Sequence, residues 1–222
     1  MNDLTLIIPA KKEAESLPIF LKEIDTLKFK KMIVLQKEDY ETKKDLNNFQ
    51  NIEIYEQMNN GYGNALIEGI NNCTTKYCCI INADGSMDPK YLDEMLKECK
   101  YRDFIFASRY ERPGGGSDDD TIVTLIGNKI FSLMGNILYN LNISDILYTY
   151  ILGKTESFKN LNLISNDFRL CVELPIKAKK KGLTYRCLAS YERSRIAGKK
   201  KVNAIKDGFL ILIEILSFIL KK

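Results

Sequence analysis

The segment Asn82-Ala83-Asp84-Gly85-Ser86-Met87-Asp88-Pro89 brings carboxylate, amide and hydroxyl side chains together in a short stretch of chain. It follows the apolar run Tyr77-Cys78-Cys79-Ile80-Ile81, which has the composition of a buried strand. Asp88-Pro89 is typical of a helix start, since proline is tolerated in the first turn. Ligands bind at the carboxyl ends of strands in open α/β sheets. Asp84 is therefore a candidate ligand for a divalent cation that carries substrate phosphates, and an Asx-type turn is the alternative.

The composition excludes several classes of chemistry. The 222-residue chain contains no histidine, which excludes Ser-His and Cys-His catalytic pairs, His-ligated zinc and imidazole acid–base catalysis. Any proton transfer must then use Asp, Glu, Lys, Tyr, Cys or the substrate. The net charge of +4 is too small to indicate a nucleic-acid partner. A hydrophobic content of 45% indicates an ordinary globular chain with a core.

The cysteines indicate a reducing compartment. The six thiols, at positions 73, 78, 79, 99, 171 and 187, lack the spacing of metal ligands. Cys78 and Cys79 are adjacent in an expected strand, so their side chains point to opposite faces. We expect reduced core thiols, with a metal or redox role as the alternative. Because Met1 leads almost directly into an expected strand, we expect no signal peptide and a cytoplasmic location.

The elements that position the polar segment alternate in the first half of the chain. Apolar runs predict strands at 4–8, 32–35, 52–55, 77–81 and 104–107. Helical spacing, capping residues or composition predict helices at 16–27, 43–49, 63–72 and 91–100. Strands separated by helices imply right-handed βαβ units and a mostly parallel sheet.

The second half of the chain has a different character. Residues 113–120 have the composition of a mobile loop. Further expected elements are a helix-rich stretch at 121–141, a helix at 167–181 kinked at Pro175, a strand at 183–191, a basic loop at 193–201 and an apolar helix at 204–220. We expect residues 1–203 to form the main domain and residues 204–222 to form a separate apolar helix.

Several stretches together resemble family-2 glycosyltransferases. The segment from Asn82 resembles the metal motif of that family in the form "DADGQHDP". Further resemblances, in chain order, lie in residues 4–13, 59–65 with Gly69, 107–110 with 114–116, Phe168 with Glu173, and 195–201. These stretches follow the order and spacing of the family motifs, and together they span roughly residues 4–215. The closest branch is that of the dolichol- or polyprenyl-phosphate sugar transferases.

The resemblance implies a fold and an activity. The fold is the GT-A nucleotide-diphospho-sugar transferase fold, a Rossmann-like α/β arrangement with a mostly parallel sheet flanked by helices. The activity is metal-assisted, inverting transfer of a sugar from a GDP- or UDP-linked donor, with Mg²⁺ or Mn²⁺ as cofactor. The implied acceptor is a polyprenyl phosphate or a surface-glycan intermediate. An acceptor phosphate is already anionic and needs no general base, which agrees with a chain that lacks histidine.

The resemblance also implies the site residues. Those that would bind the donor are Pro9, Ala10, Glu13, Gln36, Asn59, Gly63, Asn82 and Ala83. Those that would act in catalysis are Asp84, as metal ligand, and Arg109, Arg195 and Lys201, facing an anionic group on the acceptor side. Gly61 and Gly63 would let the backbone approach a ligand or cross a helix closely. For Glu13 the alternative is a carboxylate in the first turn of a helix, and for the basic loop it is a solvated surface.

The chain departs from the family at several of these positions. Gln36-Lys37-Glu38-Asp39 stands where the family has an aspartate pair, and Asn82 replaces the first aspartate of the metal motif. Lys12, Lys200 and Thr124 are further departures. The nucleotide site is then less negative than is usual in the family. Three explanations remain: Lys12 or Lys37 replaces part of the positive charge that the metal provides, the donor differs, or the transferase activity is lost. Because an amide both donates and accepts, Gln36 predicts weaker discrimination among nucleobases.

Two other functions and three roles for the last helix remain as alternatives. A catalytically degenerate binding protein would bind nucleotide without turnover. A sugar-phosphate nucleotidyltransferase would need glycines after the first strand, and Pro9 to Ala14 contain none. The helix at 204–220 is too short to span a bilayer. It would lie on the inner face of the membrane, form a homodimer, or pack on the catalytic domain.

Overall fold

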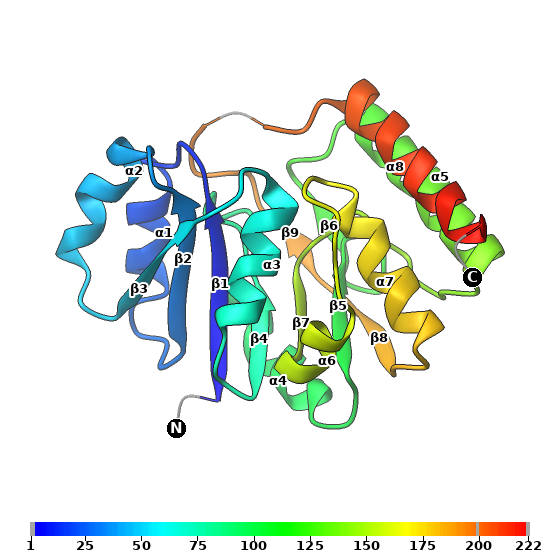
Figure 1. Ribbon diagram of the computed structural model, residues 1–222, viewed down its shortest axis with the longest axis horizontal. Helices are drawn as coiled ribbons and strands as arrows, with labels where there is room; N and C mark the ends of the chain where they lie inside the picture. The colour runs from blue at the N-terminus through cyan, green and yellow to red at the C-terminus, as the bar shows by residue number, and fades with distance from the viewer. Residues whose placement is uncertain (1–2, 199, 221–222) are drawn as a thin grey trace.

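A seven-stranded sheet forms the centre of the molecule, with strand order β3-β2-β1-β4-β7-β5-β8 (Figure 1). The computed structural model describes residues 3–198 and 200–220. The strands are β1 Leu4–Ala10, β2 Lys30–Gln36, β3 Ile52–Gln57, β4 Tyr77–Ile80, β5 Phe104–Ser108, β7 Ile151–Lys154 and β8 Tyr185–Ala189. All neighbours pair in parallel except β7, which is antiparallel to both β4 and β5. The predicted mostly parallel sheet is confirmed.

Helices cover both faces of the sheet, and its inner strands are therefore buried on both sides. One core contains side chains of α1 Leu17–Glu23 and α4 Leu92–Cys99. The other contains side chains of α3 Tyr62–Asn72, α6 Thr155–Asn160 and α7 Leu170–Lys180. Cys79 belongs to the first core and Cys78 to the second, which confirms their predicted opposite orientation. All six cysteines are free thiols.

Strand β7 was not predicted from the sequence, yet it positions part of the site. Gly153 lies at its centre, where a Cβ atom would come within 2.4 Å of the Phe104 ring and 2.7 Å of the Phe158 ring. Because β7 runs antiparallel to its neighbours, the residues that precede it lie at the carboxyl ends of β4 and β5. Tyr148 and Thr149 thereby reach the same edge of the sheet as Asp84.

Other boundaries differ from the prediction in detail. The helix expected at 43–49 is α2 Tyr40–Lys44 followed by a 3₁₀ turn, Asp45–Asn48, and a second 3₁₀ turn, Pro89–Tyr91, precedes α4. The helix expected from residue 167 begins at Leu170, and Pro175 lies inside it. The strand expected at 183–191 is divided into β8 and β9 Tyr191–Glu192, and β9 pairs with β6 Gly116–Ser117 in a second small sheet.

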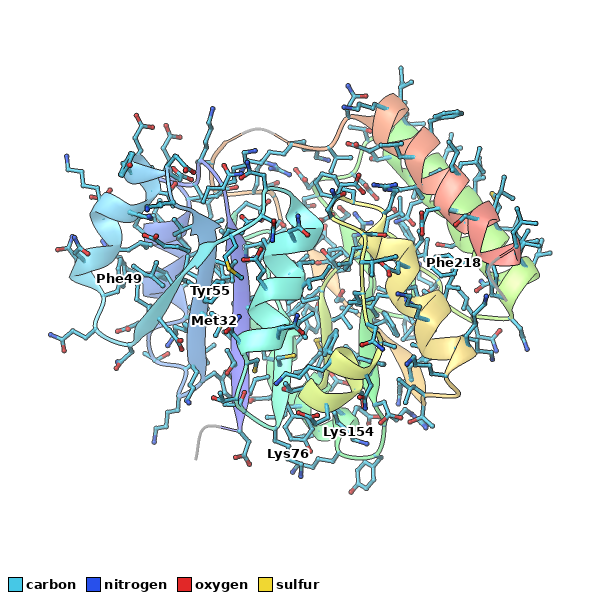
Figure 2. All side chains as sticks on the ribbon, viewed as in Figure 1. Met32, Phe49, Tyr55, Lys76, Lys154 and Phe218 are labelled. Atoms are coloured by element: carbon cyan, nitrogen blue, oxygen red, sulfur yellow. The ribbon has the colours of Figure 1, made fainter. Side chains whose placement is uncertain are left out.

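Two apolar helices lie side by side at one end of the molecule, α5 Ile122–Tyr139 and α8 Ala204–Leu220 (Figure 1). Within the described residues, α5 has the length and mean hydropathy, 1.3, of a helix that could cross a membrane, and 17% of it is buried. Phe218 of α8 lies near α7 (Figure 2), with the Lys180 ammonium 5.5 Å from its ring centre. The division at residue 203 stays a prediction, since Ile211, Ile215 and Phe218 join the second core.

Candidate functional site

A cavity of about 400 Å³ lies at the carboxyl ends of β1, β2 and β4. The sequence-predicted residues that line it are Pro9, Ala10, Glu13, Gln36, Asn82, Ala83, Asp84, Arg109, Arg195 and Lys201. They come from segments far apart in the chain, and they meet because parallel strands end at one edge of the sheet. Asn59 and Gly63 do not line this cavity.

Asp84 is held in a fixed orientation by the loop that follows β4. Its Oδ1 accepts hydrogen bonds from the Ser86 amide, at 3.1 Å, and the Ser86 hydroxyl, at 2.9 Å. Its Oδ2 lies 3.4 Å from a guanidinium nitrogen of Arg195. Gly85 has φ +73°, and a Cβ atom there would lie 2.4 Å from Ile196, so glycine is required at this turn. The loop thus presents one carboxylate oxygen to the cavity.

One carboxylate alone is a sparse metal site. Within residues 3–198 and 200–220, no group of three or more His, Cys, Asp or Glu side chains could hold a metal ion. Mg²⁺ commonly binds through one or two carboxylates together with substrate phosphates and water. The residues present therefore fit a cation only if a diphosphate completes its ligand shell.

The amide of Asn82 is oriented by a neighbour that sequence reasoning missed. The Tyr62 hydroxyl donates to Asn82 Oδ1 at 3.2 Å and shares a 2.7 Å hydrogen bond with Thr149. The Tyr62 ring stacks on Phe168, with centroids 4.8 Å apart. Burial raises the pKa of Tyr62, so its hydroxyl remains a donor at neutral pH. With Oδ1 engaged, Asn82 would present its amide nitrogen, a hydrogen-bond donor, to a ligand.

The basic segment that begins at Arg195 crosses the cavity and pairs with its carboxylates. The backbone amide of Ile196 donates to the Asp84 carbonyl at 2.8 Å, which ties the segment to the metal-motif loop. Arg195 binds Asp119 Oδ2 at 2.9 Å as well as approaching Asp84. Although burial opposes its charge, Asp119 and Asp84 raise the pKa of Arg195 above its usual value.

The lysines of the same segment divide between two carboxylates. The Lys200 ammonium lies 3.2 Å from Asp119, and Lys201 forms an ion pair with Glu13. Lys199 lies outside the described residues. The pairing places Lys201 beside the residue that the resemblance assigned to the donor nucleoside, whereas the sequence placed Lys201 with the acceptor.

Arg109 lies in the wall of the cavity and is committed to carboxylates. Its Nε donates to Asp145 at 2.7 Å and one terminal nitrogen donates to the same carboxylate at 3.0 Å. The other terminal nitrogen donates to Glu192 at 3.0 Å and to Asp120 at 3.4 Å. The guanidinium also lies 4.6 Å from the ring centre of Tyr148. Four of its five guanidinium N–H groups thus donate to carboxylates, and direct phosphate binding by Arg109 stays a prediction.

The carboxylates around Arg109 were missed by sequence reasoning. Asp120 belongs to the segment interpreted as a mobile loop, and nothing local marks Asp145 or Glu192. Burial raises the pKa of Glu192 above its usual value, although Arg109 opposes the shift. Only the tertiary structure brings these three carboxylates together, since each reaches Arg109 from a different segment of the chain.

Glu13 and Gln36, which also line the cavity, lie near the ends of β1 and β2. Glu13 accepts a 2.5 Å hydrogen bond from Ser16, and Gln36 donates to Asn60 at 2.6 Å. Asp39 lies outside the lining, where it caps α2 through the Thr42 amide. Lys37 is also outside the lining, so of the Gln36-Lys37 pair only Gln36 can contact a nucleobase here.

The glycines after β3 serve packing against protein. A Cβ atom at Gly63 would lie 2.0 Å from the Ser165 carbonyl, and one at Gly61 would lie 2.1 Å from the Asn166 carbonyl. Asn59 donates to Glu68 through its backbone amide, at 2.9 Å. The close approach of these glycines is to residues 165–167, and the assignment of Asn59 and Gly63 to donor binding stays a prediction. Only Gly61 of this segment's glycines reaches the cavity.

Known proteins share both this sequence pattern and this fold. Residues 5–161 match Glycosyl transferase family 2. Glycosyltransferase AglJ of Haloferax volcanii is 21% identical over 215 residues, covering 95% of this chain and 70% of that protein. An uncharacterized glycosyltransferase of Mycobacterium tuberculosis is 25% identical over 211 residues, covering 95% of this chain and 94% of the relative.

Solved structures agree on the fold. Glucosyl-3-phosphoglycerate synthase from Mycobacterium tuberculosis, solved with Mn²⁺, UDP and glucosyl-3-phosphoglycerate, aligns with a TM-score of 0.75 at 11% identity, covering 96% of this chain and 78% of that one. Mannosyl-3-phosphoglycerate synthase from Rubrobacter xylanophilus aligns with a TM-score of 0.74 at 16% identity, covering 98% and 74%. The sheet is that of the GT-A nucleotide-sugar transferases, and the chain belongs to glycosyl transferase family 2.

Proposed function

We propose that this glycosyltransferase moves a sugar from a nucleotide-sugar donor to an acceptor that carries a phosphate, with inversion and with a divalent cation bound at Asp84. The observation that carries the proposal is the oriented carboxylate of Asp84, whose Oδ1 is held by Ser86 and which lines one cavity together with Glu13 and Gln36. Glu13 and Gln36 suit a nucleoside and Asp84 suits the cation of its diphosphate. A structural neighbour solved with Mn²⁺ and UDP-glucose supports this choice of ligands.

Different residues of the cavity would contact different parts of the donor. Pro9, Ala10 and Gln36 would surround the base, and Glu13 would accept hydrogen bonds from the base or ribose. Asp84 would bind the cation, and the Asn82 amide would donate to a diphosphate oxygen. Gln36 can both donate and accept, so either a uridine or a guanosine nucleotide can be bound.

The transfer itself requires little from the protein's acids and bases. A bound divalent cation would supply positive charge to the departing diphosphate. Arg195, beside Asp84, would add a charge-assisted hydrogen bond to the same diphosphate once the donor displaces the Asp84 contact. The bond between the anomeric carbon and the diphosphate breaks while a bond to the acceptor oxygen forms on the opposite face. An acceptor phosphate is anionic, so no proton needs to be removed.

We propose a polyprenyl phosphate as the acceptor, with a surface-glycan intermediate as the alternative. The neighbouring glucosyl-3-phosphoglycerate synthase was solved with phosphoglyceric acid, which shows that this fold accommodates an acidic phosphate compound. In the present chain, Lys200 lies 3.2 Å from Asp119 at the cavity, and the second terminal nitrogen of Arg195 binds the same carboxylate. Lys200 would turn from Asp119 to an acceptor phosphate, while Arg195 stays with the donor diphosphate.

A catalytically degenerate binding protein is the second candidate. Asn82 stands where the family has an acid, and the Asp84 carboxylate is partly neutralised by Arg195. A protein of this kind would bind nucleotide but would not turn over a donor.

The test is a thermal-shift panel of uridine, guanosine and adenosine diphosphates and their sugar derivatives, with and without Mn²⁺ or Mg²⁺. We expect one nucleotide class to raise the Tm in a metal-dependent way. Ligand at about 100 times its Kd stabilises by about 2.7 kcal/mol. The stabilising donor is then assayed for transfer to a short polyprenyl phosphate. Stabilisation without turnover on this or a glycan acceptor would support the degenerate alternative, and no stabilisation by any nucleotide would contradict both.

Replacing Lys201 with methionine is expected to weaken binding of the donor nucleotide about tenfold. The ion pair with Lys201 compensates the charge of Glu13, and without it an unpaired carboxylate would face the donor. Isothermal titration with the nucleotide identified above measures the effect. Lys206→Met, an exposed lysine on α8, is the matched control and should bind normally. If Lys201→Met binds donor normally and raises only the acceptor KM, the acceptor-side assignment made from the sequence is the correct one.

A further inference from the structure

The outward face of α5 is apolar over its length. Large apolar side chains exposed on this helix are Ile122, Val123, Ile126, Ile130, Leu133, Ile137 and Leu138. Ile122 is 77% exposed and Ile137, at the other end, is 72% exposed. Soluble proteins seldom expose an apolar patch of this extent without a partner.

Helix α8 continues the same surface: it packs Ile211, Ile215 and Phe218 into the core, yet its other face is also apolar. It turns Glu214 inward, where the residue is 7% exposed beside Ile211 and Ile215. Its outward apolar side chains are Ile205, Phe209, Ile213, Leu216, Ile219 and Leu220. A helix that faces water has its carboxylates outside and its isoleucines inside. The outward face of α8 is therefore suited to an apolar medium.

The two helices form one surface. They pack side by side (Figure 1), and the Tyr139 hydroxyl of α5 donates to the Ile215 carbonyl of α8. The charged residues exposed on the described parts of these helices are Lys129 and Lys206, whereas Glu214 is buried and Asp207 is half-buried and accepts a hydrogen bond from the Asn203 amide at 2.7 Å. A second copy of this chain would present the same lysines with no exposed carboxylate on the described helices to pair with them. Apolar side chains with lysines alone are complementary to anionic lipid.

Polar contacts hold α5 against the domain and oppose a membrane-crossing orientation. Asn128 donates to the buried Asp145, which also pairs with Arg109. The Ser132 hydroxyl accepts the Ile146 amide at 3.0 Å. Crossing a bilayer would break these bonds and leave buried polar groups unpaired. The helix can meet lipid only by lying along its surface.

We infer that the outward faces of α5 and α8 dock this enzyme on an anionic lipid bilayer. Thr124 and Asn128 of α5 line the cavity, as do residues 200–202, directly before α8. Docking would therefore bring the cavity close to the lipid headgroups. The docking surface does not depend on sugar transfer, whereas delivery of a lipid-linked phosphate acceptor to this cavity rests on the proposed function.

The test is flotation of the full chain with vesicles of phosphatidylcholine mixed with phosphatidylglycerol, compared with vesicles of phosphatidylcholine alone. Truncation of α8 would expose core residues Ile211 and Ile215, so point substitutions are preferable. We expect Ile130→Glu combined with Ile213→Glu to lower the vesicle partition coefficient at least about tenfold. Ile19→Glu on α1 is the matched control, since Ile19 is 53% exposed, Ile130 51% and Ile213 47%. It should float like the wild type.

A second pair of variants tests the electrostatic part. Lys129→Ala and Lys206→Ala should each reduce binding to anionic vesicles about fivefold, and added salt should remove the difference. These exposed alanines should fold normally even if the glutamate pair does not. The inference is overturned if the wild type does not float with anionic vesicles. It is equally overturned if the double glutamate variant and both single alanine variants float as well as the wild type. It is also overturned if the wild type is a dimer without vesicle affinity and the glutamate pair is a monomer.

Discussion

Replacing Asp84 with asparagine is expected to lower sugar transfer by at least about a hundredfold while the fold stays intact. The change removes the one carboxylate charge that the metal-motif loop directs into the cavity. A neutral amide would bind a divalent cation weakly, so the departing diphosphate would lose the positive charge that stabilises it. The hydrogen bonds from Ser86 to Oδ1 can persist, because an amide oxygen also accepts.

The control for this variant is Asp88→Asn in the same segment. Asp88 caps the turn at Pro89–Tyr91 and does not line the cavity. It should retain wild-type turnover and metal-dependent nucleotide binding. Asn82→Asp is the converse change, and a second carboxylate beside Asp84 should tighten metal binding. Metal and nucleotide affinity like those of the wild type in Asp84→Asn would refute the assignment of Asp84 as the metal ligand.

Replacing Arg109 with methionine is expected to lower the free energy of unfolding by about 3–5 kcal/mol. Methionine fills much of the same space but removes the charge that compensates Asp145 and Glu192, both of which are buried. Burial already raises the pKa of Glu192, and without Arg109 the shift would increase. A carboxyl group whose pKa is higher in the folded than in the unfolded state binds more protons in the folded state. The fold therefore loses stability as the pH rises above the pKa that the group has in the unfolded chain. The destabilisation should therefore be larger at neutral pH than near pH 4.

Urea denaturation at both pH values measures this effect. Arg186→Met is the control, because the exposed Arg186 pairs with the partly exposed Glu98 and its loss should cost less than about 1 kcal/mol. Adding Asp145→Asn to Arg109→Met should restore part of the stability, since one uncompensated carboxylate is then neutral. A variant Arg109→Met with wild-type stability but lost acceptor binding would instead favour the phosphate-binding role predicted from the sequence.

Much of the fold was predictable because its signals are local. The apolar runs at β1, β2, β3, β4 and β5 and the helical spacing between them are properties of neighbouring residues. Strand β7 was missed because it is four residues long, contains Gly153 and is stabilised by pairing with β4 and β5, which are remote in the chain. Long-range pairing of this kind leaves little trace in a short segment.

The candidate site also has features that could be predicted from local sequence and features that could not. Glu13, Gln36 and Asp84 could be assigned to one cavity from the sequence, because each follows a predicted parallel strand. Which cation pairs with which carboxylate could not be assigned. Arg195 with Asp84 and Lys201 with Glu13 are contacts between the last loop and the first half of the chain. The close approach of Gly63 to the Ser165 carbonyl could not be assigned either.

The sequence by itself determined the alternation of strands and helices, the family, the lack of histidine chemistry and the strand end that carries Asp84. These properties depend on residue types and on periods of a few residues. Only the tertiary structure decided that Arg109 is enclosed by carboxylates and that α8 turns Glu214 inward while Ile205, Ile213 and Ile219 face outward. An apolar residue has the same local signal whether it faces a core or the surface. For the apolar residues of α8, the packing of this helix against α5 and α7 decides which face the core and which face the surface, and those two helices are distant in the chain.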